Sequence, residues 1–256
     1  MVGDVVGQPG RHAVRRLLPT LRSRHRIDFA IVNCENAAAG FGVTPEICDE
    51  LLDAGADCLT TGNHVWKRRE IYGYIDRCGA LLRPANYPEG APGKGWNLFR
   101  AGGVQLVVAN LLGRAHMDAL DCPFRAFDEI RRQSESITPH LIVDFHAETT
   151  SEKEAMGWYA DGRATAVIGT HTHVQTADEK VLPRGTGYLT DVGMTGPTGG
   201  ILGVDRAAVL ERFLTQMPVR FEVAAGPALL MAVIIEADAG SGRALSLTRL
   251  QEPLPG

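Results

Sequence analysis

The chain has 256 residues, a formal net charge of −4 and a hydrophobic content of 45%. This length suits one large α/β domain or two small ones, and the composition is ordinary for a globular protein. Because it has no basic tail or block of Lys and Arg, the chain is not expected to form an extended groove for duplex nucleic acid. A small nucleotide stays compatible, since bound metal cations would dominate the field around it.

Signals for membranes and disulfides are absent from the sequence. No apolar run approaches the roughly 20 residues of a membrane span, and the first residues do not resemble a signal peptide. The five cysteines are an odd number without a C-x-x-C pair, which argues against a disulfide framework and against a thiolate zinc site. We therefore expect no membrane partner and a cytoplasmic location.

The first predicted strand is very short, because only three residues precede Asp4. Strands usually run about 5–6 residues, so this one is either short or the end of a strand that starts upstream. A helix follows, with apolar residues at positions 13, 14, 17, 18 and 21, which is helical spacing. The glycines at 3, 7 and 10 do not fit the dinucleotide pattern G-x-G-x-x-G.

Strands and helices then alternate along the chain. Buried strands are predicted at 29–32, 58–61, 104–112, 141–144 and 164–168. Further helices are predicted from residue 45, capped by Thr44, and at 65–79, 121–136, 151–160 (capped by Ser151) and 205–216. Closing strands are predicted at 219–223, 228–236 and 243–250, and residues 185–203 are expected to form an irregular loop system or a flexible lid. This order predicts an α/β fold, with residues 1–256 as one domain.

Residues with metal-binding side chains follow several of these strands. They are Asp4, Glu35 with Asn36, Asn63 with His64, His146, and His171 with His173. In extended backbone, residues i and i+2 point to the same side, so His171 and His173 are expected to face one site with Thr172 turned away. In open α/β sheets, ligands bind at the carboxyl ends of strands.

Each of these residues also has an ordinary structural explanation. Asp4 and Asn63 fit turns or helix caps, Glu35 fits a helix start, His146 fits a core histidine, and one His-x-His pair can arise by chance. A metal site can be ruled out only if all of these structural explanations are true at the same time. Three histidines, two carboxylates and an amide exceed the needs of one four-coordinate ion. We therefore expect two metal ions, with Glu35 as the bridging carboxylate.

These strand-end motifs resemble those of calcineurin-type metallophosphoesterases, and more closely those of the YmdB-like subfamily over almost the whole chain. The residues that carry the resemblance are Gly3-Asp4, 33–36, Gly62-Asn63-His64, His146 and 169–173, supported by 4–7, 35–37, 83–84, 92–95, 144–148 and 190–196. Two positions depart from the wider superfamily: Val6 stands where it has His, and Glu35 where it has the bridging Asp. The short first strand departs from the subfamily and puts the support behind Asp4 in question.

The resemblance implies a four-layer α/β/β/α sandwich of two facing mixed sheets flanked by helices. It also implies a two-metal phosphodiesterase for cyclic nucleotides, with 2′,3′-cyclic nucleoside monophosphates favoured, in which a hydroxide bridging the metals attacks phosphorus. Carried over, Asp4, Glu35, Asn36 and His173 match the ligands of one metal, and Glu35, Asn63, His146 and His171 match those of the other. His64 matches the general acid. Nitrogen and oxygen ligands without thiolate suit Fe, Mn or Zn better than Mg alone, and Fe or Mn is favoured.

Other functions stay open at this point. A phosphomonoesterase or nucleotidase can use the same site, and the choice would depend on loops 83–97 and 185–203. A regulatory protein that holds metal and binds a nucleotide or RNA is a second alternative, and a structural metal protein a third. The presence of His64 favours an enzyme. The sequence does not decide whether the protein forms a homo-oligomer.

Residues near the predicted site have two interpretations each. Glu148 either orients a ligand histidine or caps the helix that follows it. Loop residues Arg83, Asn86 and Arg114 either contact phosphate or base or are simply solvated. The aromatic residues Tyr87 and Trp158 either stack on a base or belong to the core.

Overall fold

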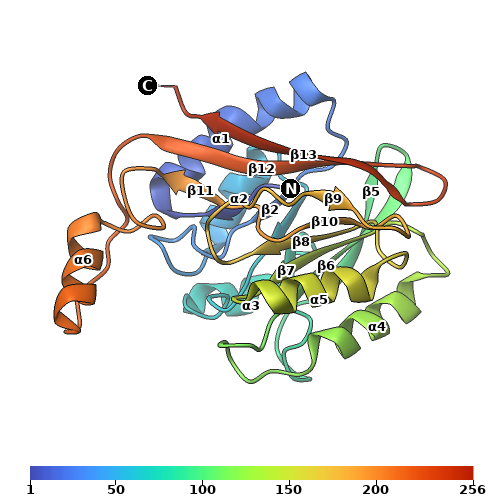
Figure 1. The fold of residues 1–256 in the computed structure, drawn as a ribbon, viewed down its shortest axis with the longest axis horizontal. Helices are drawn as coiled ribbons and strands as arrows, with labels where there is room; N and C mark the ends of the chain where they lie inside the picture. The colour runs from blue at the N-terminus through green and yellow to red at the C-terminus, as the bar shows by residue number, and fades with distance from the viewer. Residues whose placement is uncertain (256) are drawn as a thin grey trace.

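Two β-sheets lie face to face in the computed structural model, which describes residues 1–255, and helices cover their outer surfaces (Figure 1). The covering helices are α1 (Gly7–His25) and α2 (Pro45–Asp53) on the first sheet, and α4 (Pro123–Ser134) and α5 (Thr150–Ala160) on the second. The predicted four-layer α/β/β/α arrangement is confirmed.

The first sheet consists of two groups of strands that the start of the chain joins. One group has the order β1 (Asp4–Val5), β11 (Met194–Pro197), β12 (Ala228–Ala237) and β13 (Ala244–Pro253). The other is parallel, with the order β2 (Ile31–Asn33), β3 (Cys58–Thr60) and β4 (Leu81–Leu82). Val2 bridges Val32 of β2 on one side and Ala232 of β12 on the other. The two groups therefore form one layer.

The second sheet has a parallel centre. Its order is β5 (Trp96–Ala101), β6 (Val104–Leu112), β7 (Leu141–His146), β8 (Ala166–Thr170), β10 (Gly187–Leu189) and β9 (Lys180–Val181). Strands β6, β7, β8 and β10 run parallel and are largely buried, as expected for strands covered on both faces. The carboxyl ends of β7 and β8 consequently lie at one edge of the sheet.

Apolar stripes attach the helices to the sheets. In α1, Ala13, Val14 and Leu18 are buried at the helical spacing that the sequence shows. In α4, Phe127 and Ile130 are buried in the core of the second sheet. For α1 the sequence pattern thus predicts correctly which face packs inward.

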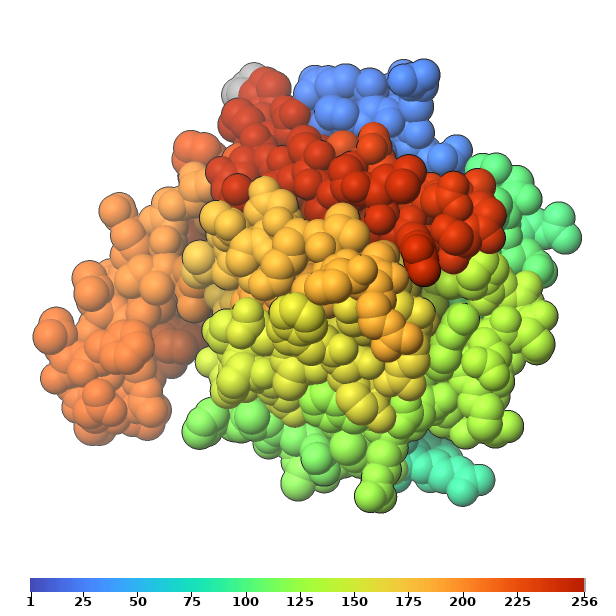
Figure 2. Space-filling model, turned by 45° about the vertical axis from the view of Figure 1, so that its right-hand side comes forward, coloured from blue at the N-terminus to red at the C-terminus, as the bar shows by residue number. Residues whose placement is uncertain are grey.

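Helix α6 (Arg206–Thr215) stands apart from the layers. It lies at the left of Figure 1 and in the orange projection of Figure 2. Its residues Phe213 and Leu214 are 73% and 83% exposed. Neither this helix nor another in residues 1–255 has both the length and the apolar character to cross a membrane.

The short first strand is supported from its neighbours. Strand β1 has two residues, yet Asp4 N donates to Gly193 O at 3.1 Å and Val6 N donates to Thr195 O at 2.9 Å. Asp4 and Val5 are fully buried. Pairing with β11 therefore fixes Asp4 despite the few residues that precede it.

The helix predicted over 65–79 is wrong. Only a 3₁₀ turn (Arg69–Ile71) and α3 (Tyr72–Ile75) are helical in this region. Directly after His64 the chain turns, since Lys67 N donates to His64 O at 3.0 Å. The Arg68 guanidinium then bonds the carbonyls of Ala38 and Phe41. These contacts tie the segment to the loop after β2 and prevent a continuous helix.

Residues 185–203 are more regular than predicted, since they include β10 and β11. The glycines there serve close packing as well as turns: a Cβ at Gly187 would lie 2.7 Å from Leu247 Cδ1. The strand predicted at 219–223 is wrong, because only Val223 forms a bridge, to Val204. Within the described part of the chain, residues 219–223 do not lie beside a strand with which they could form a ladder.

The boundaries around His146 also differ from the prediction. Strand β7 continues to His146, two residues beyond the predicted end. Helix α5 is capped by Thr149 rather than Ser151, since the Thr149 hydroxyl accepts from Glu152 N at 3.4 Å. His146 is therefore part of the rigid sheet and Glu148 lies in the connection to α5.

Candidate metal centre

The predicted site residues come together at one edge of the two sheets. Asp4 lies in β1, Glu35 and Asn36 follow β2, Asn63 and His64 follow β3, His146 ends β7, and His171 and His173 follow β8. Hydrogen bonds and close polar contacts link all eight residues. The strand ends that the sequence placed at one edge therefore meet there.

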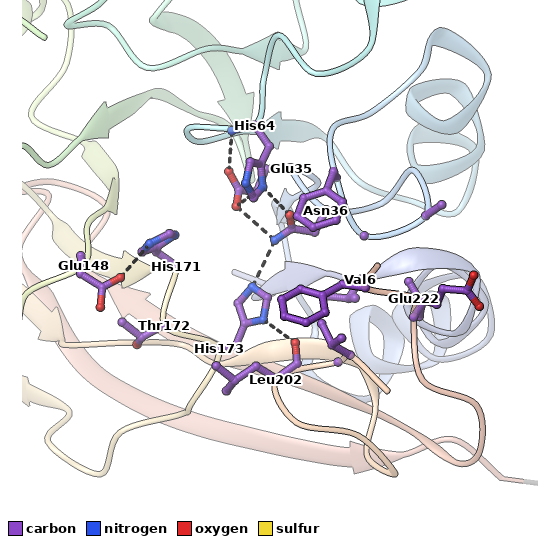
Figure 3. A pocket seen from close by; sticks show the side chains of 17 residues that line it. Val6, Glu35, Asn36, His64, Glu148, His171, Thr172, His173, Leu202 and Glu222 are labelled. Carbon is purple, nitrogen blue, oxygen red and sulfur yellow. Dashed lines mark hydrogen bonds and ion pairs between the residues drawn. The ribbon is translucent and has the colours of Figure 1, made fainter. Parts of the chain in front are cut away.

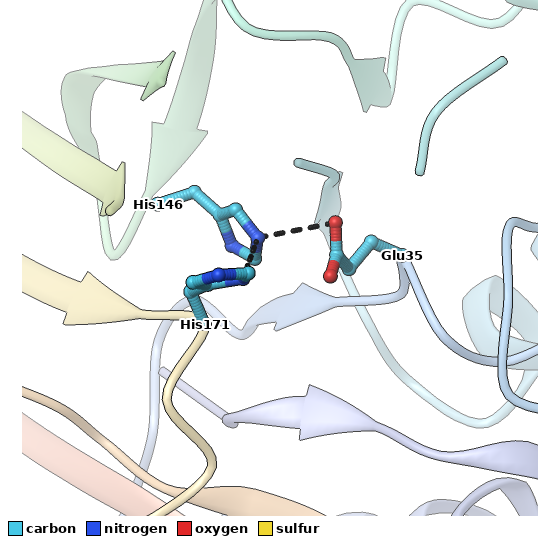
Figure 4. A group of neighbouring side chains, drawn as sticks. All are labelled: Glu35, His146 and His171. Carbon is cyan, nitrogen blue, oxygen red and sulfur yellow. Dashed lines mark hydrogen bonds and ion pairs between the residues drawn. The ribbon is translucent and has the colours of Figure 1, made fainter. Parts of the chain in front are cut away.

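One group of ligand-type atoms surrounds the imidazole of His146 (Figure 4). His146 Nε2 lies 3.2 Å from Glu35 Oε2, 3.2 Å from Asn63 Oδ1 and 3.0 Å from His171 Nδ1. His146 and Glu35 are fully buried. Ligand atoms of Glu35, His146 and His171 all lie within 4.8 Å of one another, a spacing at which they could hold one ion.

A second group shares the other oxygen of Glu35 (Figure 3). Asn36 Nδ2 lies 3.1 Å from Glu35 Oε1 and 3.1 Å from His173 Nε2. The Asp4 carboxylate contacts residues of the first group: its Oδ2 accepts from the backbone N–H of His171 at 3.2 Å, and its Oδ1 lies 3.8 Å from His146 Nδ1. The two oxygens of Glu35 thus contact side chains of both groups.

A relay of hydrogen bonds orients His146. Its Nδ1 lies 2.9 Å from Thr170 Oγ1, and the Thr170 hydroxyl donates to Asp144 Oδ1 at 2.7 Å. Because that hydroxyl donates to the carboxylate, it accepts the proton of His146 Nδ1, and Nε2 is left facing Glu35. The other Asp144 oxygen accepts from Thr60 Oγ1 and from Asn33 Nδ2. Asp144 is fully buried.

The other two imidazoles are held in the same manner. His171 Nε2 lies 3.0 Å from Glu148 Oε2, so its Nδ1 faces the first group. His173 Nδ1 lies 3.1 Å from the carbonyl of Leu202, so its Nε2 faces the second. Of the two interpretations of Glu148, the structure supports the one in which it orients a histidine. Each histidine thus has one nitrogen engaged by an acceptor and one directed at the cluster, which is usual for metal ligands.

The backbone that presents His171 and His173 is not extended. Their φ angles are +98° and +65°, a left-handed region that costs energy for residues other than glycine. The N–H and hydroxyl of Thr172 both donate to Asp191 Oδ2, at 3.0 and 2.7 Å, rather than to the cluster, although Thr172 also lies at the surface in front of the cluster. Lys153 Nζ donates to the same oxygen at 2.7 Å, and both side chains are buried. This ion pair holds the strained turn in place.

Close packing requires glycine at position 62. A Cβ there would lie 2.2 Å from Glu35 Oε2 and 2.3 Å from His146 Nε2. Any larger residue would push the two ligand-type side chains apart. Gly62 therefore lets the loop after β3 approach the cluster and place Asn63 on it.

Burial and charge shift the pKa values in the cluster. Burial raises the pKa of Asp4 to about 6, and Asp4 Oδ1 has no hydrogen-bond partner among the described residues. Burial opposes a charge on His146, but Glu35 and Asp4 outweigh it and raise the pKa of His146 to about 9. Burial and the neighbouring His146 lower the pKa of His171 to about 3. Two buried carboxylates, one with an unpaired oxygen, fit a site for cations.

His64 lies beside the cluster without being enclosed in it. Its Nδ1 is 2.7 Å from Asn36 Oδ1 and 3.4 Å from Glu35 Oε1, and its backbone N–H donates to Glu35 Oε2 at 3.3 Å. The side chain is 20% exposed, and the ring of Phe41 meets it edge-on at 5.1 Å. His64 can therefore reach both the cluster and a molecule bound in front of it.

A cavity of about 330 Å³ opens in front of the cluster (Figure 3). Its polar lining includes Glu35, Asn36, His64, Glu148, His171 and His173, and its apolar lining includes Val6, Phe41, Leu202, Val204, Phe221 and Val223. Small-molecule sites have volumes of about 300–1,000 Å³. The cavity is large enough for a small organic ligand that contacts the cluster.

Several residues considered from sequence do not line this cavity. They are Arg83, Asn86, Tyr87, Arg114 and Trp158. The Arg83 guanidinium bonds backbone carbonyls of its own loop, and Asn86 is buried against Leu112. Loop 83–97 does not reach the cavity, whereas the second predicted loop contributes Leu202 and Gly203. The substrate contacts considered for Arg83, Asn86, Tyr87, Arg114 and Trp158 are therefore not supported.

Some supporting residues were not identified from sequence. Asp144 precedes His146 by two residues on the same strand and so shares its face, which is a signal that sequence offers. Asp191 and Lys153 meet only through the fold, as do Leu202 and His173. No spacing along the chain reveals such contacts.

A four-layer sandwich whose strand ends bring three imidazoles and two carboxylates together is typical of metallophosphoesterases. Within that class, a family described as YmdB-like protein matches residues 1–250. The chain belongs to this family, and membership confirms the predicted class of enzyme, a phosphoric ester hydrolase.

Three similar proteins illustrate the relationship. A Bacillus subtilis (strain 168) protein named 2′,3′-cyclic-nucleotide 2′-phosphodiesterase is 51% identical, over 97% of this chain and 94% of that protein. The crystal structure of a hypothetical protein from Thermus thermophilus has a TM-score of 0.93 and 42% identity, and covers 99% of this chain and 98% of that one. The structure of a Mycoplasma pneumoniae protein described as a novel phosphatase has a TM-score of 0.93 and 32% identity, with 98% and 92% coverage.

Proposed function

We propose that this chain is a two-metal phosphodiesterase that hydrolyses cyclic nucleotides, and that 2′,3′-cyclic nucleoside monophosphates are its favoured class. One observation carries the proposal: three imidazoles each have one nitrogen engaged by an acceptor and the other directed at atoms around the shared carboxylate Glu35. The name of the Bacillus subtilis relative supports the choice of substrate. Residues 1–256 act as one domain in this proposal.

The two groups of side chains, with Asp4 assigned to the second, supply the two sets of ligands in this proposal. Asp4, Glu35, Asn36 and His173 would hold one ion, and Glu35, Asn63, His146 and His171 the other. The donors are nitrogen and oxygen without thiolate, which suits Fe or Mn, with Zn or Mg as alternatives. Such ions, when bound, acidify a water to supply the nucleophile and neutralise charge on the phosphoryl oxygens.

Asn36 joins the first set only through its oxygen. In the structure that oxygen faces His64 Nδ1, and the amide nitrogen faces Glu35 and His173. Turning the amide so that this oxygen also faces the cluster would let one of its two lone pairs bind the ion while the other accepts from His64 Nδ1.

His64 acts as the general acid in this proposal. As an imidazolium it donates from Nδ1 to Asn36 Oδ1 and carries on Nε2 the proton that is given to the departing ribose oxygen. A positioned acid of this kind contributes about 10²–10⁴-fold to the rate. His64 is adjacent to Asn63 in the chain and so lies beside the metal ligands without being one of them.

Hydrolysis by the purified full chain tests the function. The protein is chelated and then supplied with Mn²⁺, and 2′,3′-cyclic AMP, 3′-AMP and p-nitrophenyl phosphate are offered in parallel. We expect metal-restored cleavage of the cyclic diester and little cleavage of the monoesters. If only the monoesters are cleaved, the phosphodiesterase assignment is wrong.

A phosphomonoesterase on the same site is the second candidate, which the similarity to the Mycoplasma pneumoniae phosphatase favours. Retention of metal without any cleavage would instead support a regulatory nucleotide- or RNA-binding protein. The link to RNA, the homo-oligomer and the cytoplasmic location stay predictions.

A further inference from the structure

Two phenylalanine rings line the apolar side of the cavity. Phe41 and Phe221 are 40% and 39% exposed, so each has a ring surface that the protein leaves free. They come from segments far apart in the chain: Phe41 follows β2 and Phe221 follows α6. Neither ring takes part in the polar cluster, and the proposed chemistry does not use them.

The position of Phe41 ties it to the reacting end of the cavity. Its ring meets the His64 ring edge-on at 5.1 Å, and its carbonyl accepts from Arg68 Nε at 3.1 Å. The ring is therefore held next to the proposed general acid. A ligand that reaches His64 from the cavity also passes the ring of Phe41.

The position of Phe221 is fixed by short antiparallel contacts. Asp205 N donates to Glu222 O and Ala224 N donates to Gly203 O, each at 2.9 Å, on either side of the bridge between Val204 and Val223. The neighbouring carbonyl of Leu202 lies 3.1 Å from His173 Nδ1. The segment that carries Phe221 is thus attached to a histidine of the cluster.

We infer that Phe41 and Phe221 form a binding site for the nucleobase of the substrate. This inference rests on the proposed function. A cyclic nucleotide has an anionic phosphate at one end and a flat base at the other, and the cavity is lined both by the polar cluster and by these two aromatic rings. The base stacks on the free ring surfaces while the phosphate reaches the cluster.

This site favours a base without selecting one base strongly. Every base has a π-face, so stacking on aromatic side chains accepts any of the bases. Glu222 also lines the cavity (Figure 3), but its side chain is 70% exposed and its Oε1 lies 3.6 Å from Arg220 Nε. We therefore assign the binding of the base to the two rings.

Two substrates separate binding of the base from the chemical step. One is 2′,3′-cyclic AMP, and the other is the 2′,3′-cyclic phosphate of methyl riboside, which has the same diester without a base. Wild type, Phe41→Ala, Phe221→Ala and Phe221→Tyr are compared by KM and kcat. Phe213→Ala is the matched control, because Phe213 is 73% exposed on α6 and does not line the cavity.

We expect Phe221→Ala and Phe41→Ala to raise KM for 2′,3′-cyclic AMP by about 5- to 100-fold, the effect of losing one stacked base. Their kcat should change little, because stacking is equal in the ground and transition states. Phe221→Tyr should restore KM, and Phe213→Ala should behave as wild type. Neither alanine variant should change KM for the substrate without a base.

Equal changes in KM for both substrates, or no change for either, would overturn the inference while leaving the phosphodiesterase in place. Failure of wild type to cleave either substrate would instead contradict the proposed function. If an alanine variant loses its thermal transition, the corresponding leucine variant, which keeps apolar volume without a π-face, provides the same comparison.

Discussion

The two sides of the cavity differ in how firmly they are built. On the polar side, Asp4, Glu35 and His146 are fully buried, and a relay through Thr170 to Asp144 orients the imidazole. The apolar side depends partly on residues 198–227, which include the projecting helix α6 (Figure 2). The backbone bonds around Val204 and Val223 lie within that segment, and its polar contact with the cluster is the Leu202 carbonyl, 3.1 Å from His173 Nδ1.

This difference separates chemistry from recognition. Groups that position metal ions and move protons must be held in place before the substrate arrives, because misplacement by ~1 Å can cost 10²-fold in rate. Contacts to a base need only a surface of the right kind, and loops commonly supply such contacts on a rigid scaffold. Changes on the polar side should therefore affect turnover and folding, and changes on the apolar side should affect KM.

The largest effect is expected from His64→Gln. The substitution removes the proposed acid and leaves the proposed metal ligands in place, so kcat for 2′,3′-cyclic AMP should fall by about 10²–10⁴-fold. Metal content measured on the same samples should stay at the wild-type value. Unchanged turnover would remove His64 from the mechanism.

Asp191→Leu should strongly destabilise the fold. It leaves the Lys153 ammonium buried without its partner, and breaking a buried pair in this way costs about 3–5 kcal/mol. Urea denaturation measures the loss. The substitution Asp191→Leu also removes the acceptor of both Thr172 hydrogen bonds, so the turn that presents His171 and His173 loses its support.

The double variant Lys153→Met with Asp191→Leu sharpens this test. Removing both charges should recover most of the lost stability. Activity should stay low, because Thr172 still has no carboxylate to bond. Full recovery of activity would show that the buried pair does not position the histidines.

A smaller effect is expected from Asp144→Asn, which weakens the relay that orients His146. Loss of a partner that orients a ligand histidine typically reduces metal affinity by about 10–100-fold. Competition with a chelator for Mn²⁺ measures that affinity. Asp128→Asn is the matched control, since its ion pair with Arg163 is partly exposed and distant from the cluster; an equal loss in both variants would argue against the relay.

The smallest effect concerns the pH dependence of stability at Asp178. Partial burial opposes its charge, but bonds from Thr176 and Thr190 outweigh that and lower the pKa of Asp178. A carboxyl with a lowered folded pKa stabilises the fold above its unfolded pKa of about 3.9, and this contribution is lost as the pH falls through the folded value.

Asp178→Asn should therefore flatten the dependence of unfolding free energy on pH below about pH 4. Denaturation by urea at several acidic pH values checks it. A dependence as steep as that of wild type would mean that Asp178 does not contribute in the folded state.

Sequence predicted the polar side of the cavity better than the apolar side. Strand ends that carry Glu35, His146 and His171 could be placed at one edge, because parallel strands share their direction. Phe221 gave no such signal, because the strand predicted around it does not form and its position depends on contacts with residues 203–205. The helix predicted after His64 failed for a related reason, since Arg68 bonds a loop that is distant in the chain.

The conformation of the His171–His173 turn was also beyond prediction. The sequence indicated that both imidazoles face one site, and they do, but through left-handed backbone rather than an extended strand. That backbone is stabilised by Asp191 and Lys153, which are distant in sequence. Local spacing can therefore identify ligand candidates, while tertiary contacts decide how they are presented.

We propose that Glu35 joins two separate metal sites, and the most direct test counts metal ions per chain after loading with Mn²⁺ and removing free ions, for wild type, Asp4→Asn and His171→Ala. We expect two ions in wild type and one in each variant, because Asp4 and His171 belong to different proposed sets of ligands. A single ion in wild type, or two ions in both variants, would contradict the proposal.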